Sequence, residues 1–365
     1  MAYTTIDDPS AHFQVKLYTG NSTNNTAITN DGNSNLQPDL IWAKSRSNTH
    51  YHDLRDSSRG IDERLVSNTT GVAATKDQSY VSFDSDGFTL GDDTDGSALN
   101  TVNTSSNNYV AWQWKCNGGT TSSNSSGSIT STVQANTTAG FSISTYTGNG
   151  TTGATIGHGL GVVPNWVMVK GRTVQNDWAI YHHRNTSAPE TDVINLQSTD
   201  GTSDSDTRWN DTAPTSTLVT FGNNAAVNAN TYNYVAYCFA EKQGYSKFNS
   251  YTGNGNADGP FVYTGFKPAW VMWKRTDANG NSWGLVDHRR NKNDTQDVGN
   301  VIDVYLAADL DNDDSGNSDT MDFLSNGFKV RRTGNFINVD GSTYIYMAFA
   351  ESPFVSSEGV PTTAR

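Results

Sequence analysis

The chain has 365 residues and a formal net charge of −13 at pH 7, and its lysines and arginines form no cluster. This balance argues against a nucleic-acid partner, because binding to phosphates needs a basic face. The polar composition does not indicate disorder, since the chain holds 9 Trp, 16 Tyr and 14 Phe and disordered segments are poor in aromatics. Short aromatic and β-branched runs separated by Gly, Asn, Asp and Ser predict an all-β protein with many turns.

The N-terminal stretch MAYTTIDDPS has neither a basic n-region nor an apolar h-region, so we expect no secretory signal peptide. No apolar run approaches membrane-spanning length, and we expect no membrane insertion. The two cysteines, Cys116 and Cys238, occupy different offsets in corresponding segments. A disulfide between them is possible, but their placement does not imply one.

One short phrase recurs along the chain as LYTGN from Leu17, TYTGNG from Thr145 and SYTGNG from Ser250. Each copy is followed by a proline-led apolar strand and later by an aromatic closing strand. The proline-led strands begin at Pro38, Pro164 and Pro268, and the closing strands begin at Tyr109, Tyr234 and Tyr344. Similar spacing of three landmarks in three copies indicates a triplicated module.

We therefore predict three tandem homologous β-sandwich domains, jelly-roll-like, at residues 1–120, 121–243 and 244–365. The closing strands are apolar or aromatic on both faces, which predicts a central position in each sheet. The YTGN phrase marks a strand end and a polar turn, and we expect Gly and Asn there to use positive φ. We also expect its three tyrosines to occupy equivalent, largely buried positions.

Two segments depart from this pattern. DLRDSSRGIDERLVS, at residues 53–67, is the only stretch in which a helix is plausible, and Gly60 weakens it. Residues 117–128 are rich in Gly, Ser, Asn and Thr and predict a flexible linker after the first copy. The second boundary, at residues 242–246, is much tighter, so we expect copies two and three to pack against each other.

A tryptophan followed by histidine and arginine occurs at matching spacing in two copies, as Trp178, His183, Arg184 and as Trp283, His288, Arg289. Such residues could bind a sugar, with the ring stacked on a pyranose and the polar groups on its hydroxyls. The alternative is that each tryptophan packs in the core and the His-Arg pair ends a strand.

An acidic loop gives a candidate calcium site. Oxygen-bearing side chains at Asp311, Asp313, Ser315, Asp319 and Asp322, with Gly316 at the sixth position, match a Ca²⁺-loop template. The match departs from the template at its last ligand and lacks flanking helices, and such a loop also suits a solvated turn. Structural calcium is the one cofactor this pattern suggests.

The MAYTTIDD start and the phrases KLYTGN, GFSISTYTGNG, GHGLGVVPNWVMVK and NYVAYCFAEKQGYSKFNSYTGNG carry a resemblance that covers essentially the whole chain. The chain resembles a family of repeat-bearing virion structural proteins of marine bacteriophages, especially those of cyanobacteria and abundant ocean bacteria. The resemblance implies synthesis in the host cytoplasm, a place in the virion and contacts with other virion proteins. It supplies no functional residues.

Three functions are compatible with these patterns. The first is a tail-fibre or adhesion component that contacts the host surface, with a surface glycan as the candidate receptor. The second is a capsid decoration (cement) protein, in which three like domains match a site of local threefold symmetry. The third, a polysaccharide-degrading enzyme, has no nucleophile elbow, HExxH motif or zinc spacing to support it, and we expect no enzyme. We expect the chain to be part of an oligomer in the particle.

Overall fold

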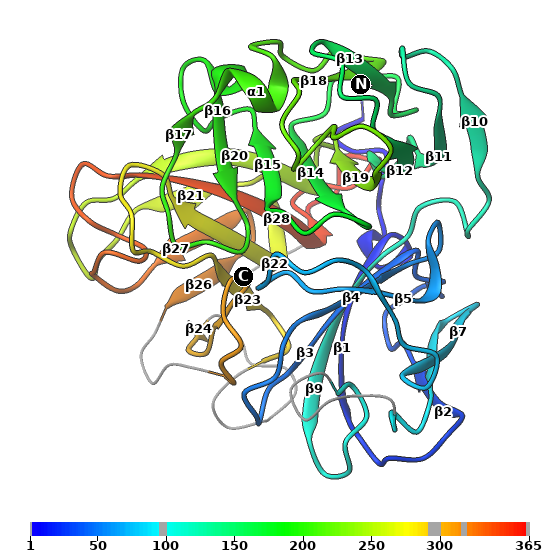
Figure 1. Cartoon of the computed structure of the whole chain (residues 1–365). Coiled ribbons are helices and arrows are strands. Elements are labelled where there is room, and N and C mark those ends of the chain that lie inside the picture. The colour runs from blue at the N-terminus through cyan, green and yellow to red at the C-terminus, as the bar shows by residue number, and fades with distance from the viewer. Residues whose placement is uncertain (1, 95–100, 291–300, 315–319, 363–365) are drawn as a thin grey trace.

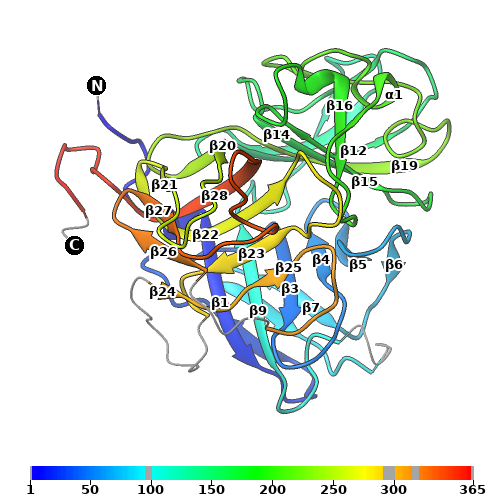
Figure 2. The same ribbon diagram turned by 90° about the vertical axis from the view of Figure 1, so that its left-hand side faces the viewer.

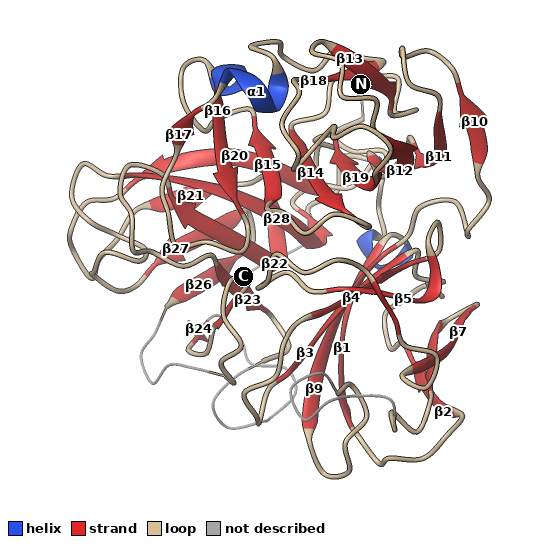
Figure 3. Cartoon of the chain, in the orientation of Figure 1, coloured by secondary structure: helices blue, strands red, loops and turns tan. Residues whose placement is uncertain are grey.

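The structure is a computed structural model, and it describes residues 2–94, 101–290, 301–314 and 320–362. It is nearly all β, as predicted, with antiparallel sheets throughout (Figures 1 and 3). The helical elements of the described residues are short: η1 (Pro9–Ala11), η2 (Pro189–Thr191) and α1 (Asp206–Trp209). None of the described helices has the length and apolarity needed to cross a membrane.

The strands fall into three groups, which we call unit 1 (residues 13–114), unit 2 (residues 122–239) and unit 3 (residues 246–353). Unit 1 contains β1 (Phe13–Thr19), β2 (Thr26–Thr29), β3 (Leu40–Ser45), β4 (Asp53–Asp56), β5 (Gly60–Leu65), β6 (Ala74–Thr75), β7 (Tyr80–Asp84), β8 (Gly87–Leu90) and β9 (Asn108–Trp114). Unit 2 contains β10 (Ser122–Asn124), β11 (Ser131–Asn136), β12 (Phe141–Thr147), β13 (Ala154–Gly157), β14 (Trp166–Gly171), β15 (Trp178–His182), β16 (Asp192–Asn195), β17 (Ser203–Asp204), β18 (Leu218–Phe221) and β19 (Asn233–Phe239). Unit 3 contains β20 (Ser246–Thr252), β21 (Phe261–Tyr263), β22 (Phe266–Arg275), β23 (Gly284–Asp287), β24 (Val301–Ile302), β25 (Leu306–Ala307), β26 (Met321–Leu324), β27 (Gly327–Val330) and β28 (Thr343–Pro353).

Each unit has a large and a small sheet, and the same strand order recurs in the large sheets. The orders are β1-β9-β3-β4-β5-β6 in unit 1, β10-β11-β12-β19-β14-β15-β16-β17 in unit 2 and β20-β28-β22-β23-β25 in unit 3. The closing strands β9, β19 and β28 are therefore central, as their apolar faces predict. The small sheets are β2-β8-β7, β13-β18 and β21-β27-β26-β24.

The three large sheets share one core. One face of each packs on its own small sheet, through separate clusters that include Ala111 in unit 1, Ala236 in unit 2 and Ala348 in unit 3. The opposite faces meet in a single buried cluster rich in Trp, Phe and Met, with members from all three units. Figure 2 shows the result as three neighbouring lobes, coloured blue to cyan, green, and yellow to red. The units thus form one fused block around a shared core.

The N-terminal segment joins the beginning of the chain to its end. Tyr3 donates its hydroxyl hydrogen to the carbonyl of Gly265 at 2.8 Å, and the hydroxyl of Thr4 donates to the carbonyl of Gln243 at 2.8 Å. Ser357 binds the Asp7 carboxylate through its backbone N–H at 2.6 Å. The first residues of the chain therefore lie against unit 3 and the segments that flank it in sequence.

The YTGN phrase has the same role in all three units. Its tyrosine stacks on the first tyrosine of the closing strand, in the pairs Tyr18–Tyr109, Tyr146–Tyr234 and Tyr251–Tyr344. The ring centroids of these pairs lie 5.0 to 5.2 Å apart. The backbone N–H of the phrase's asparagine donates to a buried asparagine side chain in each unit: Asn103, Asn228 or Asn338. The equivalence expected for the three tyrosines is confirmed, although Tyr18 is only half-buried.

Positive φ is found, as expected, at the second glycine of the phrase in the two copies that have one, Gly150 (φ +68°) and Gly255 (φ +67°), but the first glycine is needed for another reason. Gly148 does not have positive φ. A Cβ there would lie 2.4 Å from the carbonyl oxygen of Ala229, so the position needs glycine for close backbone approach. Gly20 and Gly253 face the same obstacle, at 2.3 Å from Thr104 O and 2.1 Å from Val339 O.

Two local expectations are corrected. Residues 53–67 form β4 and β5 and no helix, because Gly60 turns the chain at φ +103° and both strands pair within the large sheet of unit 1. The segment 117–128 is not a free linker. It contains β10, and Gly118 and Gly119 donate their N–H groups to the Asp39 carboxylate at 2.9 and 2.7 Å.

Candidate functional site

A cyclic set of hydrogen bonds joins the units. Strand pairing places His52, Trp178 and Trp283 at the same position of units 1, 2 and 3. Each ring N–H reaches a backbone carbonyl of another unit: His52 to Ala307 at 2.9 Å, Trp178 to Val66 at 2.9 Å and Trp283 to Asn195 at 3.0 Å. Unit 1 therefore binds unit 3, unit 2 binds unit 1, and unit 3 binds unit 2, which closes a ring.

A second set of contacts runs around the same ring. The indole N–H of Trp112 donates to Asp287 at 3.0 Å, and the hydroxyl of Tyr237 donates to Asp56 at 2.6 Å. Asp56 and Asp287 hold equivalent positions, and His182 occupies the third. The His182 ring bonds to the carbonyl of Tyr346 at 3.1 Å. We call these contacts between two units joints. Each joint is buried, so its polar groups depend on one another for hydrogen-bond partners.

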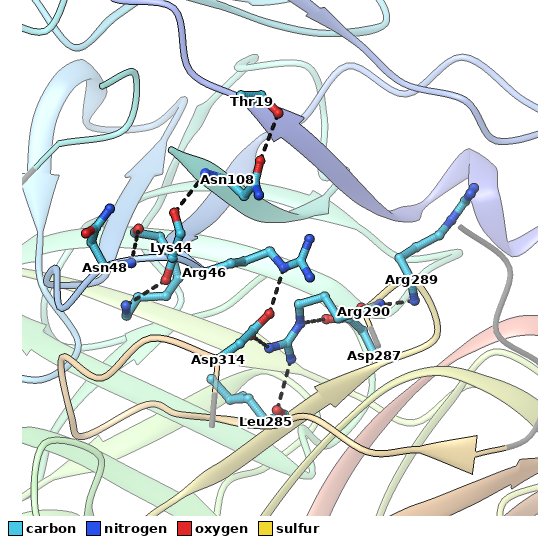
Figure 4. A network of polar contacts seen from close by, with 12 residues as sticks. Thr19, Lys44, Arg46, Asn48, Asn108, Leu285, Asp287, Arg289, Arg290 and Asp314 are labelled. Atoms are coloured by element: carbon cyan, nitrogen blue, oxygen red, sulfur yellow. Dashed lines mark hydrogen bonds and ion pairs between the residues drawn. The ribbon is translucent and has the colours of Figure 1, made fainter. Parts of the chain in front are cut away.

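The joint between units 1 and 3 carries a network of charges (Figure 4). Asp314 accepts from Arg46 at 2.8 Å and from Arg290 at 2.6 Å. Arg290 also pairs with Asp287 at 2.6 Å, and both side chains are fully buried. Burial alone would raise the pKa of Asp287, but the pairing with Arg290 and the bond from Trp112 outweigh it and lower that pKa. The network is therefore a fixed ion cluster that ties an acidic loop of unit 3 to unit 1.

The candidate sugar-binding residues do not form one surface. Trp178 and Trp283 are buried in the shared core, and their ring N–H groups are used between units. His183 and His288 bind the backbone carbonyls of Phe248 and Ala269. Arg184 is exposed, whereas Arg289 pairs with Asp31 at 3.0 Å. This placement matches the alternative interpretation, in which tryptophan packs inside and the His-Arg pair follows the strand.

Of the candidate calcium ligands, Ser315 and Asp319 lie outside the described residues. Asp311 and Asp313 belong to the loop that faces Lys44 of unit 1, and their charges favour its protonated form. Asp322 lies on β26, 3.4 Å from Arg331. Within the described part of the chain, no group of three or more His, Cys, Asp or Glu side chains could hold a metal ion. The described residues of this loop lie beside positively charged side chains of the protein itself: Lys44, Arg46 and Arg290.

Two buried histidines at the joints have fixed neutral forms. In His52, Nδ1 accepts from the indole N–H of Trp42 and Nε2 donates to the carbonyl of Ala307. In His182, Nδ1 accepts from the N–H of Arg184 and Nε2 donates to Tyr346. A second proton would sit on Nδ1 and would place its N–H opposite the N–H group that Nδ1 now accepts from. Burial lowers the pKa of both rings to about 3.

We expect these histidines to make the fold sensitive to acid. Their folded pKa lies below the unfolded value, so the unfolded chain binds protons first and stability falls as pH drops from about 6.5 towards 3. Each ring should cost about 1.4 kcal/mol per pH unit in that window. Urea unfolding of wild type and His182→Gln between about pH 7 and pH 5 measures this. An equal slope in the two proteins would contradict it, whatever the stability of the variant.

Asp309 is a buried carboxyl at a position where the other units carry amides. Its Oδ1 accepts the N–H of Trp283, as Asn68 accepts that of His52 and Gln197 that of Trp178. Its Oδ2 is buried and, among the described residues, has no hydrogen-bond partner. Burial raises the pKa of Asp309 to about 6.

We therefore expect Asp309→Asn to stabilise the protein by about 1–3 kcal/mol near pH 8, measured by urea unfolding. The folded pKa lies above the unfolded one, so the carboxyl costs stability progressively as pH rises through about 4 to 6. The gain should vanish near pH 4, and the converse variant, Asn68→Asp, should lose stability near pH 8. Unchanged stability of Asp309→Asn at pH 8 would refute the assignment.

The surface of unit 3 holds a cavity of about 530 Å³. It lies between the loop at residues 280–282, the end of β25 and the loop at residues 332–336. Tyr305, Phe336 and Arg332 contribute its largest side chains. No motif in the sequence pointed to these residues. A comparison of the three copies could have found them, because these residues do not recur at the matching positions of units 1 and 2.

The geometry defines an all-β protein in which three pairs of sandwich-like sheets close around a common core. A family model described as a domain of unknown function (DUF7483) matches residues 8–353, and the chain belongs to this family. The match spans all three units. No curated protein and no solved structure matches the chain significantly.

Proposed function

We propose that the chain is a bacteriophage virion structural protein made of three homologous β-sandwich domains, near residues 1–120, 121–243 and 244–365. The recurrent strand order and the matching tyrosine pairs support descent of the three units from one module. The phage assignment rests on the sequence resemblance. We propose a binding role without catalysis.

The cyclic contacts between units carry the structural part of this proposal. Ring N–H groups at one repeated position each bind the next unit in a closed order. Such closure is what three subunits of a homotrimer would make, here within a single chain. A block of this kind suits docking onto a threefold-symmetric partner, such as a trimeric fibre.

Within the particle, we propose that the protein belongs to a tail fibre or adhesion device and contacts the host surface. The pocket of unit 3 supports this role, because it supplies a concave site on an otherwise structural block. Labelled antibodies on intact particles, combined with binding of purified protein to host cells, test it. Many copies over the head, with no binding to host cells, would overturn it.

The second candidate is a capsid decoration protein. The cyclic arrangement of the units favours it, since three like lobes around one axis match a local threefold site of a head lattice. A low-resolution map of the particle separates the two roles: density over the head supports decoration, and a few copies at the tail support attachment.

A further inference from the structure

The pocket of unit 3 is lined by an aromatic ladder. Phe336 lies against the buried Trp273 at 5.1 Å between ring centroids, and its carbonyl accepts the Trp273 indole N–H at 3.0 Å. Tyr305 continues the ladder, 4.9 Å from Phe336. Tyr305 and Phe336 are half-buried, so part of each side chain remains accessible in the pocket. A buried ring thus holds two accessible ones in place.

The positively charged side chain of Arg332 completes this lining. The guanidinium of Arg332 lies 5.9 Å from the Tyr305 ring centroid. No carboxylate among the described residues pairs with it, whereas the neighbouring Arg331 lies 3.4 Å from Asp322. In a chain with a net charge of −13, an available guanidinium in a pocket is a local attraction for an anion.

The matching positions of unit 2 are closed. Strand pairing and the tyrosine hydroxyl bonds align Tyr305 with Val193, Phe336 with Ala226 and Arg332 with Gly222. A Cβ on Gly222 would lie 2.2 Å from the carbonyl oxygen of Thr207 in α1, so backbone takes the place of a side chain there. Val193 and Ala226 are buried in one cluster with Trp209 of α1.

Unit 1 is also closed at the position that matches Arg332. Gly91 aligns with Arg332, and a Cβ there would lie 1.9 Å from the carbonyl oxygen of Gln78. Within the part of the chain that the structure describes, the pocket of unit 3 is therefore built on positions that are closed in unit 2 and, at the position of Arg332, in unit 1.

We propose that this pocket binds a saccharide residue that carries a carboxylate. The sugar ring packs on Tyr305 and Phe336, and the carboxylate pairs with Arg332. Aromatic rings supply the apolar faces that a pyranose needs, and a guanidinium binds a carboxylate through two parallel hydrogen bonds. The exposed Asn312 and Asn335, which also line the pocket, supply donors and acceptors for hydroxyls. The inference rests on the proposed role in host attachment and names the ligand class of that role.

Ligand-detected NMR with D-glucuronic acid and with D-glucose as its neutral counterpart tests the proposal. Wild type should bind glucuronic acid with a dissociation constant of roughly 0.1–10 mM, more tightly than glucose. The double variant Tyr305→Val/Phe336→Ala carries the residues of unit 2 and should weaken glucuronic acid binding at least about tenfold. Arg332→Gln should remove the preference over glucose. Tyr232→Ala, which truncates an exposed tyrosine of a unit 2 turn, should bind as wild type does.

No binding of glucuronic acid by wild type, or equal binding by the folded double variant, overturns the proposal. Folding of the variants is checked by thermal unfolding, and Arg332→Gln changes only an accessible side chain. Binding of wild type and the double variant to host cells is measured in parallel. Host binding that persists in the double variant removes the pocket from attachment and leaves the proposed function standing. Wild type that binds glucuronic acid but not host cells contradicts the attachment role instead.

Discussion

Trp270→Ala is expected to lower the free energy of unfolding by about 3–5 kcal/mol and to do so for the whole chain at once. The Trp270 side chain is fully buried at the centre of the shared core. Its ring centroid lies 5.7 Å from that of Trp114 and 6.2 Å from that of Trp112, both in unit 1. It also lies 6.0 Å from that of Phe349 in its own unit. Removal of the indole leaves a cavity bordered by two units.

The informative readout is the number of transitions. Urea unfolding followed by tryptophan fluorescence and by far-UV circular dichroism should give one shared midpoint in both wild type and variant. Tyr232→Ala, at an exposed turn, should change stability by no more than about 0.5 kcal/mol. If units 1 and 2 kept the wild-type midpoint while unit 3 unfolded early, the units would be independent and the shared core would not couple them.

Asp287→Ala is expected to cost about 3–5 kcal/mol, because it removes one of the three hydrogen-bond partners of the buried Arg290 guanidinium and its fully buried counter-charge. Asp287 and Arg290 are fully buried, and Asp287 also accepts the indole N–H of Trp112 across the joint. The variant keeps the bond from Arg290 to Asp314. It leaves the indole N–H of Trp112 without its acceptor and the buried Arg290 charge without its buried carboxylate. Denaturant unfolding near pH 7 measures the loss.

Two variants bracket this result. Asp56→Ala removes the equivalent acid of unit 1, which pairs with the buried Arg59 and accepts from Tyr237, and should cost a similar amount. Asp277→Ala removes the partner of Arg275 at a site where the aspartate side chain is 40% exposed, and should cost less than about 1 kcal/mol. A loss at Asp287 as small as that at Asp277 would mean that the joint between units 1 and 3 contributes little to stability.

The strand pattern could be predicted because it is local. Alternation in the closing strands identified their central position, and the YTGN phrase located three equivalent turns. These features depend on residues close in sequence and on backbone hydrogen bonds between neighbouring strands. The helix considered for residues 53–67 was wrong because the same spacing of polar and apolar residues also suits two short strands, β4 and β5, joined by a turn at Gly60.

The environment of single side chains could not be predicted. Trp178 and Trp283 were candidates for a sugar surface, yet both face another unit. The local sequence around a tryptophan on a strand is the same whether its ring faces solvent or packs on a neighbouring sheet. The residues of the unit 3 pocket were missed for the same reason, since Tyr305 and Phe336 lie 31 positions apart and meet only after folding.

The sequence by itself determined that the protein is all β and that one pattern recurs three times, because strand alternation and turn chemistry act over a few residues. Only the tertiary structure decided that the units fuse around one core, that ring N–H groups close them into a cycle, and that a pocket stays open in unit 3 at positions that are closed in unit 2. These are outcomes of packing between segments far apart in the chain, where burial and partner geometry, and not local propensity, set the role of each side chain.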